Sequence, residues 1–327
     1  MNEAPRQDPD PTVHYGVSQR RTKQLTTVFF MVVFLVISYF LGRSIISQWA
    51  LIRDHSWQID YRWLAGSMLV LWIVSFHIIN LWRYILFTVS GKWLKFGGAF
   101  RITILSNLGK YLPGKVWAVM GMFYLLNREG YSTASALACS VLHQTFTLIA
   151  GAIFIFIILG QEIFHGMSVA FLGLGALLSI IILYPPIFSG ILNWGLRMLK
   201  REPLVVRLTF AKSIFLLLLY ILSWTMYGTS FWCLLHALGI QPESFWLSVA
   251  TFDAAYLLGF LAIFAPGGLG VREGVLTVLL SATITPGLAA LIAVASRLWM
   301  TLFEVSQLLP LAITKIIGVK SGSRKTS

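Results

Sequence analysis

Two short stretches of this chain combine basic residues with a proline–glycine pair inside otherwise apolar sequence. The first is "NLGKYLPGKVW", residues 107–117, and the second is "APGGLGVREG", residues 265–274. Proline removes a backbone donor and glycine permits unusual backbone angles, so each pair predicts a break in a helix. A helix that begins after such a break presents free N–H groups and a positive dipole end, which favour an anion. Basic side chains at the same place predict a site for a negatively charged group.

The candidate binding residues lie at the two breaks and among the ionisable residues of the apolar sequence beside them. Asn107 and Lys110 are three residues apart, so they share one helix face. Asp253 is nearly alone in an apolar run and is a candidate partner for a base of the other break. Each charge at the centre of a bilayer costs about 2.5–3.5 kcal/mol, so a partner or a function is expected. The residues predicted to bind a substrate are Asn107, Lys110, Tyr111, Pro113, Gly114, Lys115, Asp253, Pro266, Gly267, Gly268, Gly270, Arg272, Glu273 and Arg297.

The same ionisable residues also allow purely structural roles. Lys115 and Arg272 either bind an anion, extend to a membrane interface or pair internally. Arg297 and Glu304 are seven residues apart with Thr301 between them, so all three share a helix face. Arg297 and Glu304 are therefore either an ion pair or parts of a relay.

The composition places both breaks in a membrane protein. Of the 327 residues, 57% are hydrophobic and 11% are charged, whereas a soluble domain has about 25% charged residues. Apolar runs long enough to cross a bilayer recur at about 25–43, 64–87, 132–159, 167–193, 213–237 and 286–312.

Two further apolar runs, 98–126 and 247–281, are interrupted near the middle by the Pro-Gly pairs. The interruption leaves arms of roughly 12 to 18 residues, which are about 18–27 Å long as helices. The shorter arms cannot cross a hydrocarbon core of about 30 Å. Each run is therefore either one broken crossing or a hairpin that enters and leaves on the same side.

Loop charge favours the hairpins, because cytoplasmic loops are rich in Lys and Arg. If the N-terminus is cytoplasmic and both runs are hairpins, most of the 25 basic residues fall on the cytoplasmic side, including those of the loop 194–212. Three loops on the other side, around Glu162, Glu243 and Thr283, then hold none. If both runs cross, the basic loop 194–212 moves outside. The sequence therefore predicts an all-α polytopic membrane protein with six full spans, two re-entrant hairpins and cytoplasmic N- and C-termini.

This arrangement makes the chain an inverted repeat. Residues 25–159 form a span, a span, a hairpin and a span, and residues 167–312 repeat that order from the opposite side of the membrane. Matching interruptions in two inverted halves indicate the binding site of a transporter. The single membrane domain, 25–312, is expected to lie between a disordered cytoplasmic tail, 1–24, and a basic cytoplasmic tail, 313–327.

"NLGKYLPGKVW", followed by "NREGYS", and "APGGLGVREG" together resemble the lysylphosphatidylglycerol synthase transmembrane family, which is also described as flippase-like. The resemblance extends from about residue 25 to residue 312. It implies a multi-pass protein of a bacterial (inner) or archaeal plasma membrane with a role in moving lipids between leaflets. The named members carry a soluble aminoacyl-transferase domain after the membrane part. Because this chain stops at Ser327, the synthase activity is not expected.

We expect a lipid transporter that moves an anionic or zwitterionic headgroup between leaflets by alternating access, with Lys110, Lys115 and Arg272 contacting phosphate. The alternatives are a small-anion transporter or channel, and a non-transporting membrane partner of a lipid- or glycan-modifying enzyme. The sequence has no P-loop, nucleophile elbow or metal-ligand spacing, so no catalysis, cofactor or metal is expected. The expected partner is a membrane phospholipid or another lipid-linked substrate, not a nucleic acid. A homodimer and a separate lipid-modifying enzyme are left open as further partners.

Overall fold

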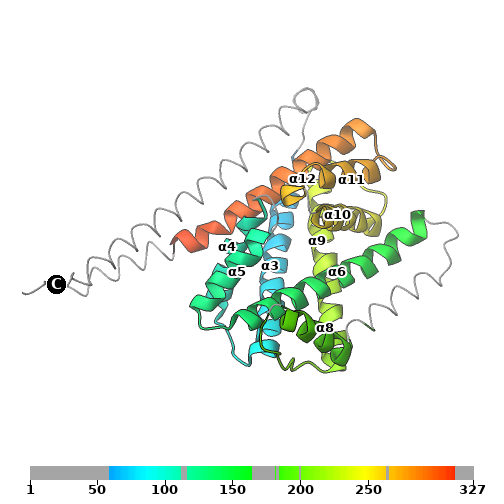
Figure 1. The fold of residues 1–327 in the computed structure, drawn as a ribbon. Helices are drawn as coiled ribbons and strands as arrows, with labels where there is room; N and C mark the ends of the chain where they lie inside the picture. The colour runs from blue at the N-terminus through cyan, green and yellow to red at the C-terminus, as the bar shows by residue number, and fades with distance from the viewer. Residues whose placement is uncertain are drawn as a thin grey trace, which may run out of the picture.

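The computed structural model describes residues 59–111, 116–163, 181, 184–198, 200–262 and 265–313. All regular structure within those residues is helical, which confirms the predicted all-α class. The elements are α3 (Tyr61–Ser90), α4 (Phe96–Asn107), η1 (Leu108–Tyr111), α5 (Val116–Arg128), α6 (Thr133–Ile163), α8 (Pro185–Met198), α9 (Phe210–Ala237), α10 (Phe245–Leu261), η2 (Pro266–Gly268), α11 (Val271–Leu280) and α12 (Pro286–Ser306) (Figure 1).

Among the described residues, four helices are long and apolar enough to cross a membrane, and they coincide with four of the six predicted spans. They are Tyr61–Ser90, Thr133–Gly160, Phe210–Ala237 and Pro286–Ile313, of 28 or 30 residues each. Helices of that length measure about 42–45 Å, which exceeds a hydrocarbon core of about 30 Å.

The remaining predictions for the ends of the chain and for two spans fall largely outside the described residues. They concern the tail 1–24, the span 25–43, most of the span 167–193 and most of the tail 313–327. The last part of the span 167–193 is the helix α8, which continues beyond the predicted end to Met198.

The first interrupted run folds into a pair of short antiparallel helices, α4 and α5. At the open end of the pair, the guanidinium of Arg101 lies 2.8 Å from the carboxylate of Glu129. At the other end, Gly109 lies directly against the backbone of Ala118. Contacts between residues 28 apart at one end and nine apart at the other show that the chain reverses direction between α4 and α5.

The second interrupted run forms an equivalent pair, α10 and α11. Gly259, near the end of α10, lies against Arg272 at the start of α11, while Leu279, near the end of α11, packs with Ala250 and Ala254 of α10. The longest of the four arms is α10, with 17 residues, or about 26 Å. None of these arms spans a core of about 30 Å by itself.

The helices α3 and α9 form the most extensive contact of the fold, and they also run antiparallel. The backbone N–H of Asp60 donates to the carbonyl of Ala237 at 2.9 Å at one end, and the N–H of Arg207 donates to the carbonyl of Thr88 at 3.0 Å at the other. This contact joins the part of the chain that carries the first helix pair to the part that carries the second.

The helix α12 packs along α11 and also passes the tips of both helix pairs (Figure 1). Its side chains Ile292, Trp299 and Phe303 belong to a buried cluster shared with α3, α9, α10 and α11. Near its end, the amide of Gln307 donates to the hydroxyl of Ser75 in α3 at 2.6 Å. Because α12 is fixed to this core, one of its faces is held beside η1 and η2.

The close approach of α4 and α5 is testable at Gly109. A β-carbon at Gly109 would lie 2.5 Å from the backbone nitrogen of Ala118, so a larger residue forces the two helices apart. We expect Gly109→Ala to destabilise the protein by about 1–3 kcal/mol, the usual cost of overpacking, measured as a lower unfolding temperature in detergent.

Gly97→Ala is the matched control, because Gly97 lies in α4, directly before η1 in the chain, and a β-carbon there meets no atom within 4 Å. Alanine has the higher helix propensity, so Gly97→Ala should leave stability unchanged or slightly raised. Equal unfolding temperatures for the two variants would contradict the close packing of α4 and α5.

Candidate functional site

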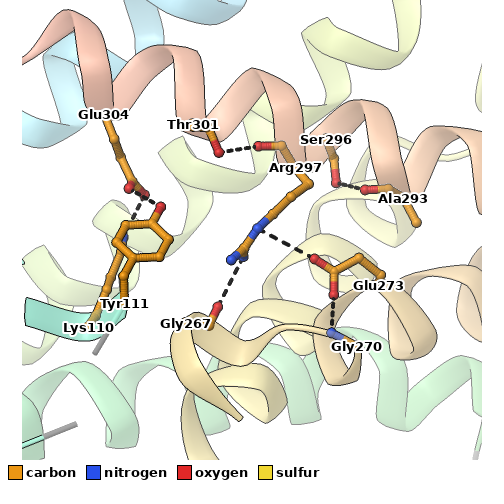
Figure 2. Close-up of polar contacts among 10 residues, drawn as sticks. All are labelled: Lys110, Tyr111, Gly267, Gly270, Glu273, Ala293, Ser296, Arg297, Thr301 and Glu304. Carbon is orange, nitrogen blue, oxygen red and sulfur yellow. Dashed lines mark hydrogen bonds and ion pairs between the residues drawn. The ribbon is translucent and has the colours of Figure 1, made fainter. Parts of the chain in front are cut away.

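The tips of the two helix pairs meet beside α12. The elements η1 and η2 contact each other, and a β-carbon at Gly267 would come within 3.5 Å of the ring of Tyr111. Two polar contacts, made by residues seven positions apart on α12, hold the two tips (Figure 2). We call these the Glu304 contact and the Arg297 contact.

The Glu304 contact holds the first tip. Lys110 Nζ lies 2.5 Å from Glu304 Oε1, and the hydroxyl of Tyr111 donates to Glu304 Oε2 at 2.5 Å. The side chains of Lys110 and Glu304 are 30% and 19% exposed. Both oxygens of one carboxylate are therefore engaged by neighbouring residues of η1, in short charge-assisted hydrogen bonds of the strong kind.

The Arg297 contact holds the second tip. Arg297 Nη1 donates to the carbonyl of Gly267 at 3.0 Å, and its Nε lies 3.6 Å from Glu273 Oε1, an ion pair longer than a hydrogen bond. The other carboxylate oxygen of Glu273 accepts from the N–H of Gly270 at 2.7 Å, at the start of α11. Arg297 thus satisfies a carbonyl of irregular backbone and also neutralises the carboxylate that caps α11.

Glycine is required at the second tip for two reasons. Gly267, Gly268 and Gly270 have φ angles of 58°, 72° and 80°, a left-handed region that other residues adopt at a cost. A β-carbon at Gly268 would also lie 2.8 Å from the carbonyl oxygen of Gly259. The sequence "PGGLG" therefore lets the chain turn sharply with its backbone against the end of α10.

A third base and a third acid lie within the α10–α11 pair. Arg272 is 6% exposed and its guanidinium carbon lies 4.8 Å and 4.7 Å from the ring centroids of Phe252 and Tyr256. Asp253 is fully buried, and neither of its carboxylate oxygens has a hydrogen-bond partner among the described residues. The described part of the tip region thus contains Lys110, Arg272 and Arg297 together with Asp253, Glu273 and Glu304.

The structure brings most of the predicted binding residues into one region. Those in the two contacts are Lys110, Tyr111, Gly267, Gly270, Glu273 and Arg297. Gly268 lies within η2, and Asn107 is an exposed residue at the end of α4. Pro113, Gly114 and Lys115 lie outside the described residues, as does the side chain of Pro266.

Two pairings that the sequence allows are not found among the described residues, and Lys115, the other base of the first break, lies outside them. Asp253 does not pair with Lys110 of the other tip, because Lys110 is bound to Glu304, and the charged neighbour of Asp253 is Arg272 of its own helix pair. Arg297 and Glu304 do not pair with each other either. Each turns toward a different tip, and Thr301 between them donates to the carbonyl of Arg297 at 2.9 Å (Figure 2).

Glu304 is the residue that the predicted binding set omits. The sequence does carry a signal for it, since it is an isolated carboxylate in an apolar helix, on the same face as Arg297. The spacing reveals the shared face but not the partner, which comes from a residue 194 positions earlier in the chain.

The strength of the Glu304 contact is testable by a double-mutant cycle with Lys110→Met and Glu304→Gln. Residues in direct ionic contact usually show coupling of about 0.5–3 kcal/mol, and low exposure places this pair toward the upper part of that range. The free energy of unfolding in detergent, measured for the single and double variants, gives the coupling.

The pair Arg101–Glu129 serves as the control for this cycle, because it has a similar geometry but 51% and 34% exposed side chains. Exposed pairs contribute about 0.2–1 kcal/mol. If the Lys110–Glu304 coupling is no larger than the control coupling, the contact does not fasten the first tip.

Comparison with known proteins identifies the family of this chain. The family model described as the lysylphosphatidylglycerol synthase TM region matches residues 24–305. The comparison with curated proteins gives no match. The matched segment includes both helix pairs, both tips and the Arg297 and Glu304 contacts. With most of its length matched, this chain belongs to the lysylphosphatidylglycerol synthase transmembrane family and is a multi-pass membrane protein.

Proposed function

We propose that the protein is a flippase-like transporter that moves a lipid with an anionic or zwitterionic headgroup between leaflets by alternating access. One observation carries the proposal: two broken helix pairs place their tips against each other and against a charged face of α12, within a fold of apolar helices. Irregular backbone at membrane depth persists only where protein or a wet cavity satisfies it. In transporters, such discontinuous helices form the substrate site.

The order of the described helices supports two halves of opposite orientation. The series α3, α4–α5 pair and α6 is followed by the series α9, α10–α11 pair and α12. The equivalent helices α3 and α9 are antiparallel, as two halves inserted in opposite directions require. On this basis α4–α5 and α10–α11 are re-entrant hairpins that enter from opposite faces of the membrane.

The cations at the tips are suited to a phosphate-bearing headgroup. Lys110 and Arg297 each contact a carboxylate, and a phosphate oxygen makes the same kind of charge-assisted contact. A headgroup therefore binds by replacing a carboxylate rather than by adding to an empty cation, while its acyl tails remain in the bilayer. Arg272 retains N–H groups without a partner among the described residues and is a deeper contact. Lys115 stays a predicted contact.

Alternating access needs one gate on each side of the substrate site, and the two contacts on α12 act as these gates. Releasing the Glu304 contact frees the first tip, and releasing the Arg297 contact frees the second. Because the two contacts use different residues of both α12 and the tips, one tip opens while the other stays closed. A headgroup phosphate that displaces Glu304 from Lys110 would itself open the first gate.

The proposed topology is testable by side-specific labelling of single cysteines. Cysteines at the exposed positions Lys92 and Glu129 should react with an impermeant reagent from one side of the membrane, and those at Gln241 and Thr283 from the other. The background protein has both native cysteines, which are buried, replaced by alanine. Reaction of positions 92 and 129 from opposite sides would show that the α4–α5 pair crosses the membrane.

Transport is testable in liposomes that carry a fluorescent phospholipid, with membrane-impermeant dithionite used to bleach the outer leaflet. Loss of a charged hydrogen-bonding partner costs about 1.5–3 kcal/mol, or about ten- to a hundredfold in rate. We therefore expect Lys110→Ala and Arg297→Ala each to slow lipid movement by about that factor. Arg101→Ala, which breaks only the ion pair at the open end of α4–α5, should leave the rate unchanged.

A charge exchange separates headgroup binding from simple fastening of the tip. The variant Lys110→Glu/Glu304→Lys restores an ion pair but removes the cation from η1, so it should recover stability without recovering transport. Full transport by this variant would assign the pair a structural role only. If Lys110→Ala and Arg297→Ala both move lipid at the native rate, the proposed site is wrong. Flux of radiolabelled phosphate without lipid movement would instead favour a small-anion transporter.

A further inference from the structure

Asp253 is a buried carboxyl group that the proposed headgroup site does not use. It lies in the middle of α10 with no exposed surface, and both of its oxygens lack a hydrogen-bond partner among the described residues. An ionised carboxylate without partners is strongly disfavoured in such a place, because burial removes the water that stabilises its charge. If Asp253 binds a proton, its carboxyl group is neutral and this cost is avoided.

The complementary group lies close by but is not paired with it. Arg272, on the adjacent helix α11, is the charged residue that interacts electrostatically with Asp253. Its guanidinium stacks on Phe252 and Tyr256, and its Nε and Nη2 atoms have no hydrogen-bond partner among the described residues. Two free donors and two free acceptors on neighbouring helices indicate a pair that is open in this conformation.

The surroundings of Asp253 contain few other titratable groups. From α9, Tyr227 interacts with it, and Tyr256 lies three residues further along α10. The α6 side chains packed around Ala250 and Ala254 are apolar: Ile155, Ile158 and Leu159. The element η2 contributes no ionisable residue, and the other ionisable residue of α11, Glu273, faces Arg297 and Gly270. Arg272 is thus the one described cation placed to compensate an ionised Asp253.

Two arrangements of this pair are electrostatically acceptable. In the first, Arg272 stacks against the two rings, as the structure shows, and a neutral Asp253 would carry a proton. In the second, Asp253 is ionised and paired with Arg272, and the proton has passed to water. Exchange between the two moves one proton and reorients a side chain in the first turn of α11, directly beside the second tip. Proton occupancy and the position of this tip are therefore linked.

We propose that Asp253 is a proton-binding site and that protons are the ions coupled to transport. The coupling rests on the proposed lipid transport and names its energy source, whereas proton binding itself rests only on the local geometry. Buried ionisable residues within membrane segments are generally functional, with proton relays among their common roles. Protonation leaves Arg272 stacked and the second tip as observed. Deprotonation draws Arg272 to Asp253 and releases that tip.

The first test detects proton binding directly and does not depend on transport. Infrared difference spectroscopy of the full chain in lipid nanodiscs should show the C=O stretch of a protonated carboxyl group that changes with pH. The band should be lost in Asp253→Asn, and it should persist in the control Asp60→Asn, because Asp60 is an exposed helix cap. A spectrum without such a band, or a band unaffected by Asp253→Asn, overturns the proposal.

The second test reads coupling in liposomes with a fluorescent phospholipid. An imposed proton gradient should drive net lipid redistribution by the native protein, and Asp253→Asn should lose the gradient dependence. The variant Asp253→Glu keeps a carboxyl group and should retain the gradient dependence. Its behaviour then separates loss of the carboxyl group from damage caused by any substitution at this position. Gradient-driven movement by Asp253→Asn, or driving by a sodium gradient in place of the proton gradient, overturns proton coupling. If the native protein moves no lipid at all, the proposed function fails, and the infrared band still decides proton binding.

Discussion

A helix that breaks inside a bilayer leaves N–H and C=O groups that no water satisfies, so the break persists only where the protein supplies partners. The second tip of this protein meets that constraint with charged side chains, and the first tip is held by contacts between side chains. At the second tip, Arg297 binds the carbonyl of Gly267 and Glu273 binds the N–H of Gly270. At the first tip, the residues of η1 are held through Glu304. The placement of both tips therefore depends on one face of α12.

The charges around the tips show how that face holds them and, in the proposed cycle, would release them. The described tip region has three bases and three acids: Lys110 with Glu304, Arg297 with Glu273, and Arg272 with the unpaired Asp253. The basic residues of the Pro-Gly stretches suggest an electropositive site when the sequence is considered alone. In the fold, Lys110 and Arg297 each contact a carboxylate, so in the proposed transporter an anion reaches either cation by replacing that carboxylate. In the proposed transporter, such an exchange would make headgroup binding and tip release the same event.

The breaks and the helix pairs were predictable because their causes are local. Proline and glycine interrupt a helix wherever they occur, and the arms of 98–126 and 247–281 match α4–α5 and α10–α11 to within a few residues. The partner of Glu304 was not predictable, because periodicity defines the face of a helix but not which distant segment packs on it. The same holds for Gly109, whose necessity comes from a backbone nine residues further along the chain.

The spacing of the two contacts restricts how α12 can move. Arg297 and Glu304 are seven residues apart on one face, or about 10.5 Å along the helix axis. Rotation of α12 about its own axis would carry both side chains away from both tips and open both gates together, which defeats alternating access. Tilting about a point between them opens one contact while pressing the other closed. Thr301 lies at that point, and its hydroxyl donates to the carbonyl of Arg297 within the same helix. Its hydrogen bond therefore does not link α12 to either tip at the point of tilting. Because α12 is packed into the core, the proposed alternating access therefore favours tilting of the helix pairs relative to α12.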